Sequence, residues 1–213
     1  MFIGFVNLIS FFILFNFASC KESNHIKANE VKPTVDLNLL HKKAKEAFKF
    51  CDAKKMNLNI CILIDMGIHS GMNRFFVWDF KSDSVLYRFP VGHGCGMNEW
   101  GKDESKDDPV FSNVENSHCS SLGKYKIGER AYSDWGVNIK YFMHGLESTN
   151  SNALKRFIVF HSWDAVSSSE IYPQGIPEGW GCPTISNDNF NLIDPLLKSS
   201  NKPILMWIYN SKE

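Results

Sequence analysis

The sequence predicts a mainly β domain with an amphipathic helix at its N-terminal end and a short helix near its C-terminal end. Apolar residues recur at helical spacing in only two segments, whereas short apolar or alternating runs recur along most of the chain. Of the 213 residues, 44% are hydrophobic and 14% are aromatic, which is enough for one domain with its own core. The sequence contains no internal repeat and no sign of a second-domain boundary.

Residues 1–20 are predicted to form a signal peptide. Residues 2–15 are nearly all apolar, which suits the hydrophobic segment of a signal peptide and is short for a membrane span. The small residues before Cys20 resemble the lipobox of bacterial lipoproteins, so we expect cleavage ahead of Cys20 and acylation of its thiol. This would place the protein on the periplasmic side of a bacterial membrane. An ordinary cleaved signal, giving a soluble periplasmic or secreted protein, and an uncleaved anchor are the alternatives.

A polar segment and a helix are expected next. Residues 21–35 are predicted to be a flexible tether, because they are polar and charged without an apolar period. The predicted domain itself covers residues 36–213. Its first element is a helix whose apolar positions follow helical spacing at Leu37, Leu40, Ala44, Ala47, Phe48 and Cys51.

Strands make up most of the remaining pattern. Residues 60–64 form a short buried run, and residues 74–80 and 85–89 alternate about a polar turn, which predicts a strand followed by a hairpin. Further strands are expected at residues 123–127, 140–144, 156–161 and 203–209.

Two other segments complete the predicted domain. The loop between Trp100 and His118 is too polar for the core and long enough to be a lid or a rim. A second, short helix is predicted from Phe190, Ile193 and Leu197, which Pro195 should bend or interrupt.

Charge and cysteine content limit the possible functions. Lys plus Arg and Asp plus Glu number 23 each, so no long-range field favours a nucleic-acid partner. Without Cys20 an odd number of cysteines remains, and in an oxidising compartment this points to one functional thiol, Cys182. The other four could pair as Cys51 with Cys61 and Cys95 with Cys119, could pair otherwise, or could be buried apolar residues.

Cys182 and His161 are the candidate nucleophile and base. The attacking species of a cysteine is the thiolate, and a free thiol has a pKa of about 8.5, so a nearby imidazole is needed at neutral pH. His161 is the natural candidate for that imidazole. Gly181 lets the backbone approach an acyl group closely, and amides around Gly181 and Cys182 could stabilise an oxyanion, where one donor is worth about 3 kcal/mol.

A series of spaced motifs resembles the murein L,D-transpeptidase catalytic domain, in the branch of the YkuD-type superfamily that has Gly-Cys-Pro at the nucleophile. In chain order the motifs are Ile64-Asp65, Ser70-Gly71-Met72-Asn73-Arg74, Val91-Gly92-His93-Gly94, Ser120-Ser121-Leu122-Gly123, His144-Gly145-Leu146-Glu147, Val159-Phe160-His161 and Trp180-Gly181-Cys182-Pro183. The resemblance implies a β-sandwich-like domain without a cofactor or metal. Gly179 departs from the Ser or Thr that is usual in the family, and it cannot supply the hydrogen bond that such a side chain would make.

The resemblance also implies an activity. In the family, the cysteine attacks the carbonyl of the third-position diaminopimelate of a peptidoglycan stem peptide and expels the terminal D-alanine. The thioester then passes to an amine on a second stem, which forms a cross-link. By this likeness Cys182 is the nucleophile, His161 the base, and Ser162 the residue that orients the imidazole through its side chain or its carbonyl. Trp180, His144 and His93 match positions that could touch the substrate or be structural.

Three alternatives stay open from the sequence. Water could resolve the thioester, which would make the protein an L,D-carboxypeptidase. His93, Cys95, His118 and Cys119, with His144 and His161, could form a zinc site for a cell-wall amidase, although their spacing matches no known zinc motif. The protein could also bind peptidoglycan without catalysis through a groove of Trp78, Trp100, Trp135 and Trp163, although aromatic residues of β proteins are more often in the core.

Overall fold

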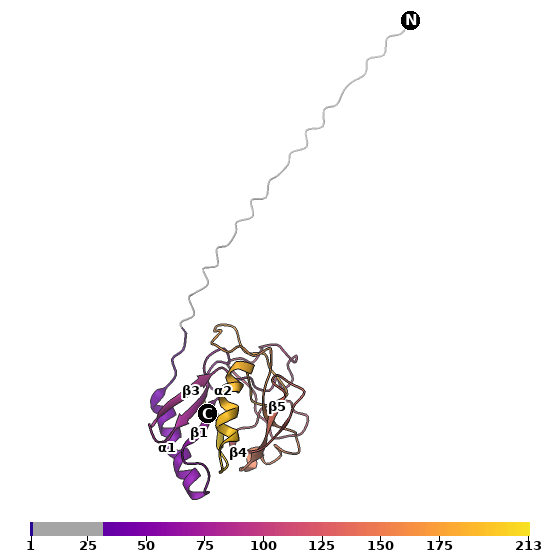
Figure 1. The fold of residues 1–213 in the computed structure, drawn as a ribbon. Coiled ribbons are helices and arrows are strands. Elements are labelled where there is room, and N and C mark those ends of the chain that lie inside the picture. The colour runs from indigo at the N-terminus through magenta and orange to yellow at the C-terminus, as the bar shows by residue number, and fades with distance from the viewer. Residues whose placement is uncertain (2–31) are drawn as a thin grey trace. The chain divides into compact units, whose positions relative to one another are not determined.

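The structure is a computed structural model that describes Met1 and residues 32–213 (Figure 1). Apart from Met1, the predicted signal peptide lies outside the described residues, as do Cys20 and residues 21–31 of the predicted tether. Within the described part of the chain, no helix combines the length and the hydropathy needed to cross a membrane.

Eight strands form one sheet, which confirms the mainly β fold. Their order across the sheet is β3-β2-β1-β8-β4-β5-β6-β7. Strand β1 pairs in parallel with β8, and β6 pairs in parallel with β7, whereas the other neighbours are antiparallel. The strands are β1 (Ile60–Asp65), β2 (Phe75–Asp79), β3 (Ser84–Phe89), β4 (Gly123–Tyr132), β5 (Ile139–Gly145), β6 (Val159–Ser162), β7 (Thr184–Ile185) and β8 (Leu205–Tyr209).

Helix α1 (Leu37–Ala53) covers one face of the sheet. Asp36 caps it by accepting hydrogen bonds from the backbone N–H groups of Asn38 and Leu39. Its buried side chains pack against alternate residues of β1 and β8, which project to that face. Leu37 and Phe48 were predicted on the apolar side but are 64% and 42% exposed, because they lie in the first turn and at the margin of the buried stripe.

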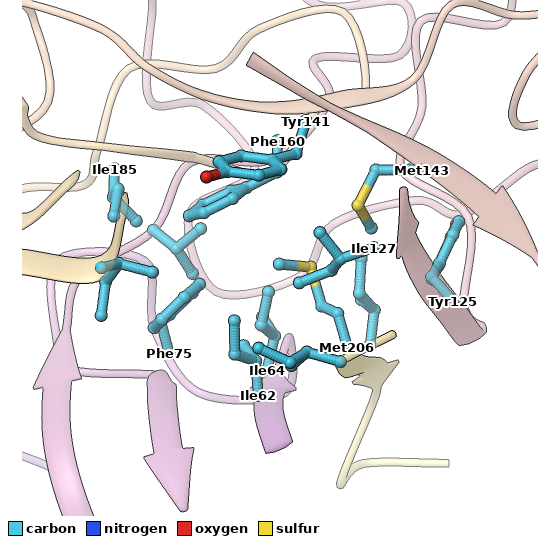
Figure 2. Close-up of a cluster of buried hydrophobic side chains, with 14 of the residues drawn as sticks. Ile62, Ile64, Phe75, Tyr125, Ile127, Tyr141, Met143, Phe160, Ile185 and Met206 are labelled. Carbon is cyan, nitrogen blue, oxygen red and sulfur yellow. The ribbon is translucent and has the colours of Figure 1, made fainter. Parts of the chain in front are cut away.

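The main core lies on the other face of the sheet. Ile62 and Ile64 of β1 point into it, together with side chains from β2, β4, β5, β6 and β8 (Figure 2). Helix α2 (Asn187–Lys198) closes this core with Phe190, Ile193 and Leu197. The helix continues past Pro195 to Lys198, so the predicted interruption at this proline, which lies in the last turn, is wrong.

The edge of the sheet formed by β5, β6 and β7 carries the candidate site. Strand β6 begins at Val159, later than predicted, because residues before it form turns. Strand β7 and the 3₁₀ helix η1 (Ser148–Asn150) were not predicted. In the parallel pair of β6 and β7, His161 lies opposite Thr184, two residues after Cys182. The short strand β7 therefore fixes the chain that follows Cys182 beside the strand that carries His161.

Candidate active site

Cys182 and His161 lie in one small pocket, with a volume of about 100 Å³. His161 comes from β6, and Cys182 lies in the segment that enters β7. The pocket, called the tryptophan pocket below, is lined by Trp100, Trp135, His161, Trp163, Gly179, Trp180, Cys182 and Thr184. The two residues chosen from the sequence as nucleophile and base are thus brought together.

The imidazole of His161 is held in a defined tautomer. Its Nδ1 lies 2.9 Å from the backbone carbonyl oxygen of Ser162, which can only accept, so Nδ1 carries the proton. Nε2 of the neutral ring is therefore free to accept a proton. The Ser162 hydroxyl is engaged elsewhere, since it accepts a hydrogen bond from the Val137 N–H at 2.9 Å. Ser162 orients the imidazole through its main chain.

The thiol of Cys182 is hydrogen-bonded to the main chain of residues 157–159 in this conformation. Its Sγ accepts from the Val159 N–H at 3.4 Å and donates to the Phe157 carbonyl oxygen at 3.7 Å. Burial raises the pKa of the Cys182 thiol above its ordinary value, although the Val159 N–H and the charge of Arg156 oppose this. Burial likewise lowers the pKa of His161. Both groups are therefore neutral near pH 7, which suits proton transfer during attack rather than a resting ion pair.

The neutral pair predicts two pH profiles. Because the pKa of the thiol is raised, alkylation of Cys182 by iodoacetamide is expected to accelerate between about pH 6 and pH 9 without a plateau. Because the pKa of His161 is lowered, kcat/KM is expected to fall only when the pH drops below about 6.5. Both rates are measured across that range on the same protein. A plateau of the alkylation rate near neutral pH would instead indicate a thiolate and imidazolium pair.

Gly181 has a conformation and a contact that require glycine. Its φ is +100°, and a Cβ at this position would lie 2.4 Å from the carbonyl oxygen of Cys119. That oxygen is fixed by a hydrogen bond of 2.6 Å from Nη2 of Arg156. The backbone N–H groups of Gly181 and Cys182 donate to no atom of residues 32–213, so they are available to an oxyanion.

Gly181→Ala is therefore expected to lower kcat by about 100-fold. The added Cβ must push the segment around Cys182, called the nucleophile loop below, away from Cys119. The matched control is Gly101→Ala. Gly101 also has a positive φ, of +80°, but a Cβ there meets nothing within 4 Å, so only the local backbone strain is added. Equal losses of kcat in the two variants would show that the close approach at Gly181 does not matter for activity.

His93 does not line the tryptophan pocket; it is fully buried in a directional chain of hydrogen bonds. Nη2 of Arg74 lies 2.7 Å from Nδ1 of His93 and can only donate, so Nδ1 accepts and the proton is on Nε2. Nε2 then donates to Ser105 Oγ at 3.0 Å, and this hydroxyl donates to Glu178 Oε1 at 3.0 Å. Burial, with the charge of Arg74, holds the pKa of His93 well below its usual range.

This chain of hydrogen bonds fixes the segment that precedes Cys182. The Glu178 carboxylate also accepts from the Ser105 N–H at 2.5 Å, and the Glu178 main chain bonds to Gly101 and Lys102. The Gly179 N–H donates to the His93 carbonyl oxygen at 2.7 Å. The first part of the predicted lid or rim, residues 100–106, is thus tied to the main chain four residues before Cys182.

His118 and His144 lie outside the tryptophan pocket. His144 on β5 pairs with Glu129 at 3.2 Å, and His118 stacks on Trp180 with 5.4 Å between ring centroids. Within residues 32–213 and Met1, no three His, Cys, Asp or Glu side chains converge in a way that could hold a metal ion. Cys51, Cys61, Cys95 and Cys119 are buried free thiols, which matches one of the alternatives left open from the sequence.

The tryptophans contribute more to the site than the sequence predicts. The sequence indicates Trp180 as a site residue, whereas it favours the core for Trp100, Trp135 and Trp163. Trp163 is 9% exposed, whereas Trp100 and Trp135 are 43% and 46% exposed and face the pocket. Trp163 and Trp180 lie within two residues of His161 and Cys182 in the sequence, whereas nothing in the sequence places Trp100 and Trp135 beside them.

A known protein family matches most of the chain. A family model described as the L,D-transpeptidase catalytic domain matches residues 31–209. No curated protein matches the sequence. Among solved structures, the helical cell shape determining protein Pgp2 from Campylobacter jejuni is 10% identical, with a TM-score of 0.46, over 72% of this chain and 48% of that one.

Two further solved structures are similarly distant. Bd1075 from Bdellovibrio bacteriovorus is 16% identical, with a TM-score of 0.41, over 72% of this chain and 49% of that one. An L,D-transpeptidase from Xylanimonas cellulosilytica is 12% identical, with a TM-score of 0.39, over 71% and 60% of the two chains. The chain spans about half the length of the Pgp2 and Bd1075 structures. Since the family model covers most of the sequence, this protein belongs to the L,D-transpeptidase catalytic domain family.

Proposed function

We propose that this protein transfers acyl groups between peptidoglycan stem peptides through a thioester on Cys182. The observation that carries the proposal is the shared pocket of Cys182 and His161, beside backbone amides that have no partner among residues 32–213. This arrangement supplies a nucleophile, a base with its acceptor nitrogen free, and candidate oxyanion donors within one site.

The first half-reaction consumes one peptide bond. Rotation of the Cys182 side chain turns Sγ from Phe157 toward Nε2 of His161, which accepts the thiol proton as Sγ attacks the donor carbonyl. The N–H groups of Gly181 and Cys182 stabilise the oxyanion of the tetrahedral intermediate. When the carbonyl reforms, the C–N bond breaks, and the departing D-amino acid takes the proton from His161. A thioester remains on Cys182.

The second half-reaction restores the enzyme. An acceptor amine attacks the thioester carbonyl and gives one proton to His161 Nε2. The C–S bond then breaks, and the Cys182 thiolate takes that proton back. The net result is a new amide between two stem peptides and one released D-amino acid.

Water as the acceptor would give the L,D-carboxypeptidase alternative. The pocket favours transfer, because four indole rings leave little polar surface around the thioester and so little room for ordered water. The non-catalytic alternative is disfavoured, because a binding protein has no need of an imidazole with a defined tautomer beside a free thiol.

The test is incubation of the purified protein with cell-wall sacculi, followed by mass analysis of the released muropeptides. New dimers linked between third-position residues are expected. Tripeptide products without new dimers would show hydrolysis, and unchanged muropeptides would contradict both enzymatic functions.

The attachment of the domain to a membrane is part of the same proposal. It is supported by the lipobox-like residues before Cys20 and by the polar composition of residues 21–35. Cys20→Ser is expected to move the protein from the membrane fraction to the soluble fraction of the cell. An unchanged distribution between the fractions would contradict a lipid anchor at Cys20.

A further inference from the structure

Four of the six tryptophans of the chain line the pocket that contains Cys182 and His161. They come from four separate segments: Trp100 from the loop after β3, Trp135 from the turn between β4 and β5, Trp163 from the residue after β6, and Trp180 from the nucleophile loop. Trp100, Trp135 and Trp180 are 43–62% exposed, so core packing does not account for their convergence. The remaining tryptophans, Trp78 and Trp207, belong to the core under α1.

The four rings are close to one another and to the base. Ring centroids of Trp100 lie 5.1 Å from Trp163, 6.1 Å from Trp135 and 6.4 Å from Trp180. The planes of Trp135 and Trp163 meet at 80°, so this pair presents an edge to a face. The centroid of Trp135 is 6.5 Å from that of the His161 imidazole. A group held by these rings is therefore beside the nitrogen that takes up protons.

The charge of the lining limits what this pocket accepts. Its other members are His161, Gly179, Cys182 and Thr184, so the lining contains no Lys, Arg, Asp or Glu. A carboxylate placed here would lose its hydration without gaining a cation, and a sugar ring would leave most of its hydroxyl groups without partners. Aliphatic residues would serve equally well for a purely apolar group. Indole faces add attraction for a cation, and tryptophan is the strongest of the aromatic side chains in this respect.

We propose that the tryptophan pocket binds the alkylammonium group of the acceptor amine before it attacks the thioester. This inference rests on the proposed function and specifies its second substrate. The ring faces hold the amine as its cation while they place it beside the thioester. The ammonium then gives one proton to bulk water on becoming the free amine, whose nitrogen attacks the thioester carbonyl while His161 Nε2 takes a second proton. The C–N bond forms, the C–S bond breaks, and Cys182 regains its proton from His161.

The direct test compares two probes of the same shape that differ in charge. Choline carries a trimethylammonium group, and 3,3-dimethyl-1-butanol replaces its nitrogen with carbon. Binding of each to the unacylated protein is followed by indole fluorescence. Choline is expected to bind about tenfold more tightly, because only the cation is attracted by the ring faces. Equal or tighter binding of the neutral alcohol would overturn the proposal.

Substitutions of Trp135 distinguish the attraction of its ring face for a cation from the apolar contact that its side chain provides. Trp135→Leu is expected to remove most of the roughly tenfold preference for choline, whereas Trp135→Phe retains part of it. Trp78→Phe is the matched control, because Trp78 lies in the core under α1, and this variant should keep the full preference. A preference that survives in Trp135→Leu would count against the pocket as the cation site. If Trp135→Leu does not fold, the comparison of the two probes on the unaltered protein still shows whether the pocket prefers the cation.

Failure of this inference is distinguishable from failure of the proposed function. Acylation of Cys182 by a donor peptide is measured on the same protein by intact mass. An acylated protein without a preference for choline would leave the proposed function in place and overturn the cation site. A preference for choline in a protein that is not acylated would support the cation site and contradict the thioester.

Discussion

Cys182→Ala is expected to lower the rate of acyl transfer by about 10⁴-fold or more, because no other thiol of residues 32–213 lines the pocket that contains His161. The other cysteines of residues 32–213 are buried, and alanine cannot form the thioester. The measurement is release of the terminal D-amino acid from a stem tetrapeptide. The fold should tolerate this change, since Sγ makes only long contacts, of 3.4 Å and 3.7 Å.

Cys51→Ala is the matched control for this substitution. Cys51 is a buried thiol of α1 that packs against the opposite face of the sheet from the main core. It should keep full activity despite a modest loss of stability. Substantial turnover by Cys182→Ala would mean that the reaction does not proceed through a thioester at this residue.

His161→Gln is expected to lower kcat by about 10³-fold, within the range typical of a general base. The glutamine amide can still donate toward the Ser162 carbonyl oxygen, but it cannot accept a proton from the thiol. The resting thiol should be little affected, because the pKa of Cys182 is set mainly by burial, the Val159 N–H and the charge of Arg156. Turnover should therefore fall while the pH profile of Cys182 alkylation stays close to that of the unaltered protein.

His144→Gln provides the comparison for the loss of an imidazole. His144 pairs with Glu129 outside the tryptophan pocket, so activity should be retained. The account would be contradicted if His161→Gln shifted the alkylation profile to higher pH as strongly as it lowered turnover. That result would place the role of His161 in ionising the resting thiol.

Most of the strands and both helices could be predicted from the spacing of apolar residues. Residues 85–89 alternate between apolar and polar residues, as a strand does, and the apolar residues from Leu40 to Cys51 have helical spacing. Strand β7 could not be predicted, because it has two residues and forms only through pairing with β6. The predicted interruption of α2 at Pro195 does not occur, because a proline in the last turn affects few of the helix's hydrogen bonds.

The candidate nucleophile and base could be chosen from the sequence, but not their surroundings. The residue types alone reveal the thiol of Cys182 and the imidazole of His161, and the structure places the two in one pocket. The role of His93 depends on Arg74, which folds beside it from another segment and is itself fully buried, so the Gly-His-Gly motif alone could not place it inside the protein. The tryptophan pocket likewise depends on four segments that only the fold brings together.

The most direct test of the thioester on Cys182 is intact-mass analysis of the protein after incubation with a stem tetrapeptide and no acceptor amine. The expected result is a protein that carries one acyl tripeptide, mapped to Cys182 by peptide fragmentation and removed by hydroxylamine. Release of the terminal D-amino acid without any adduct, or an adduct on a different residue, would contradict the account.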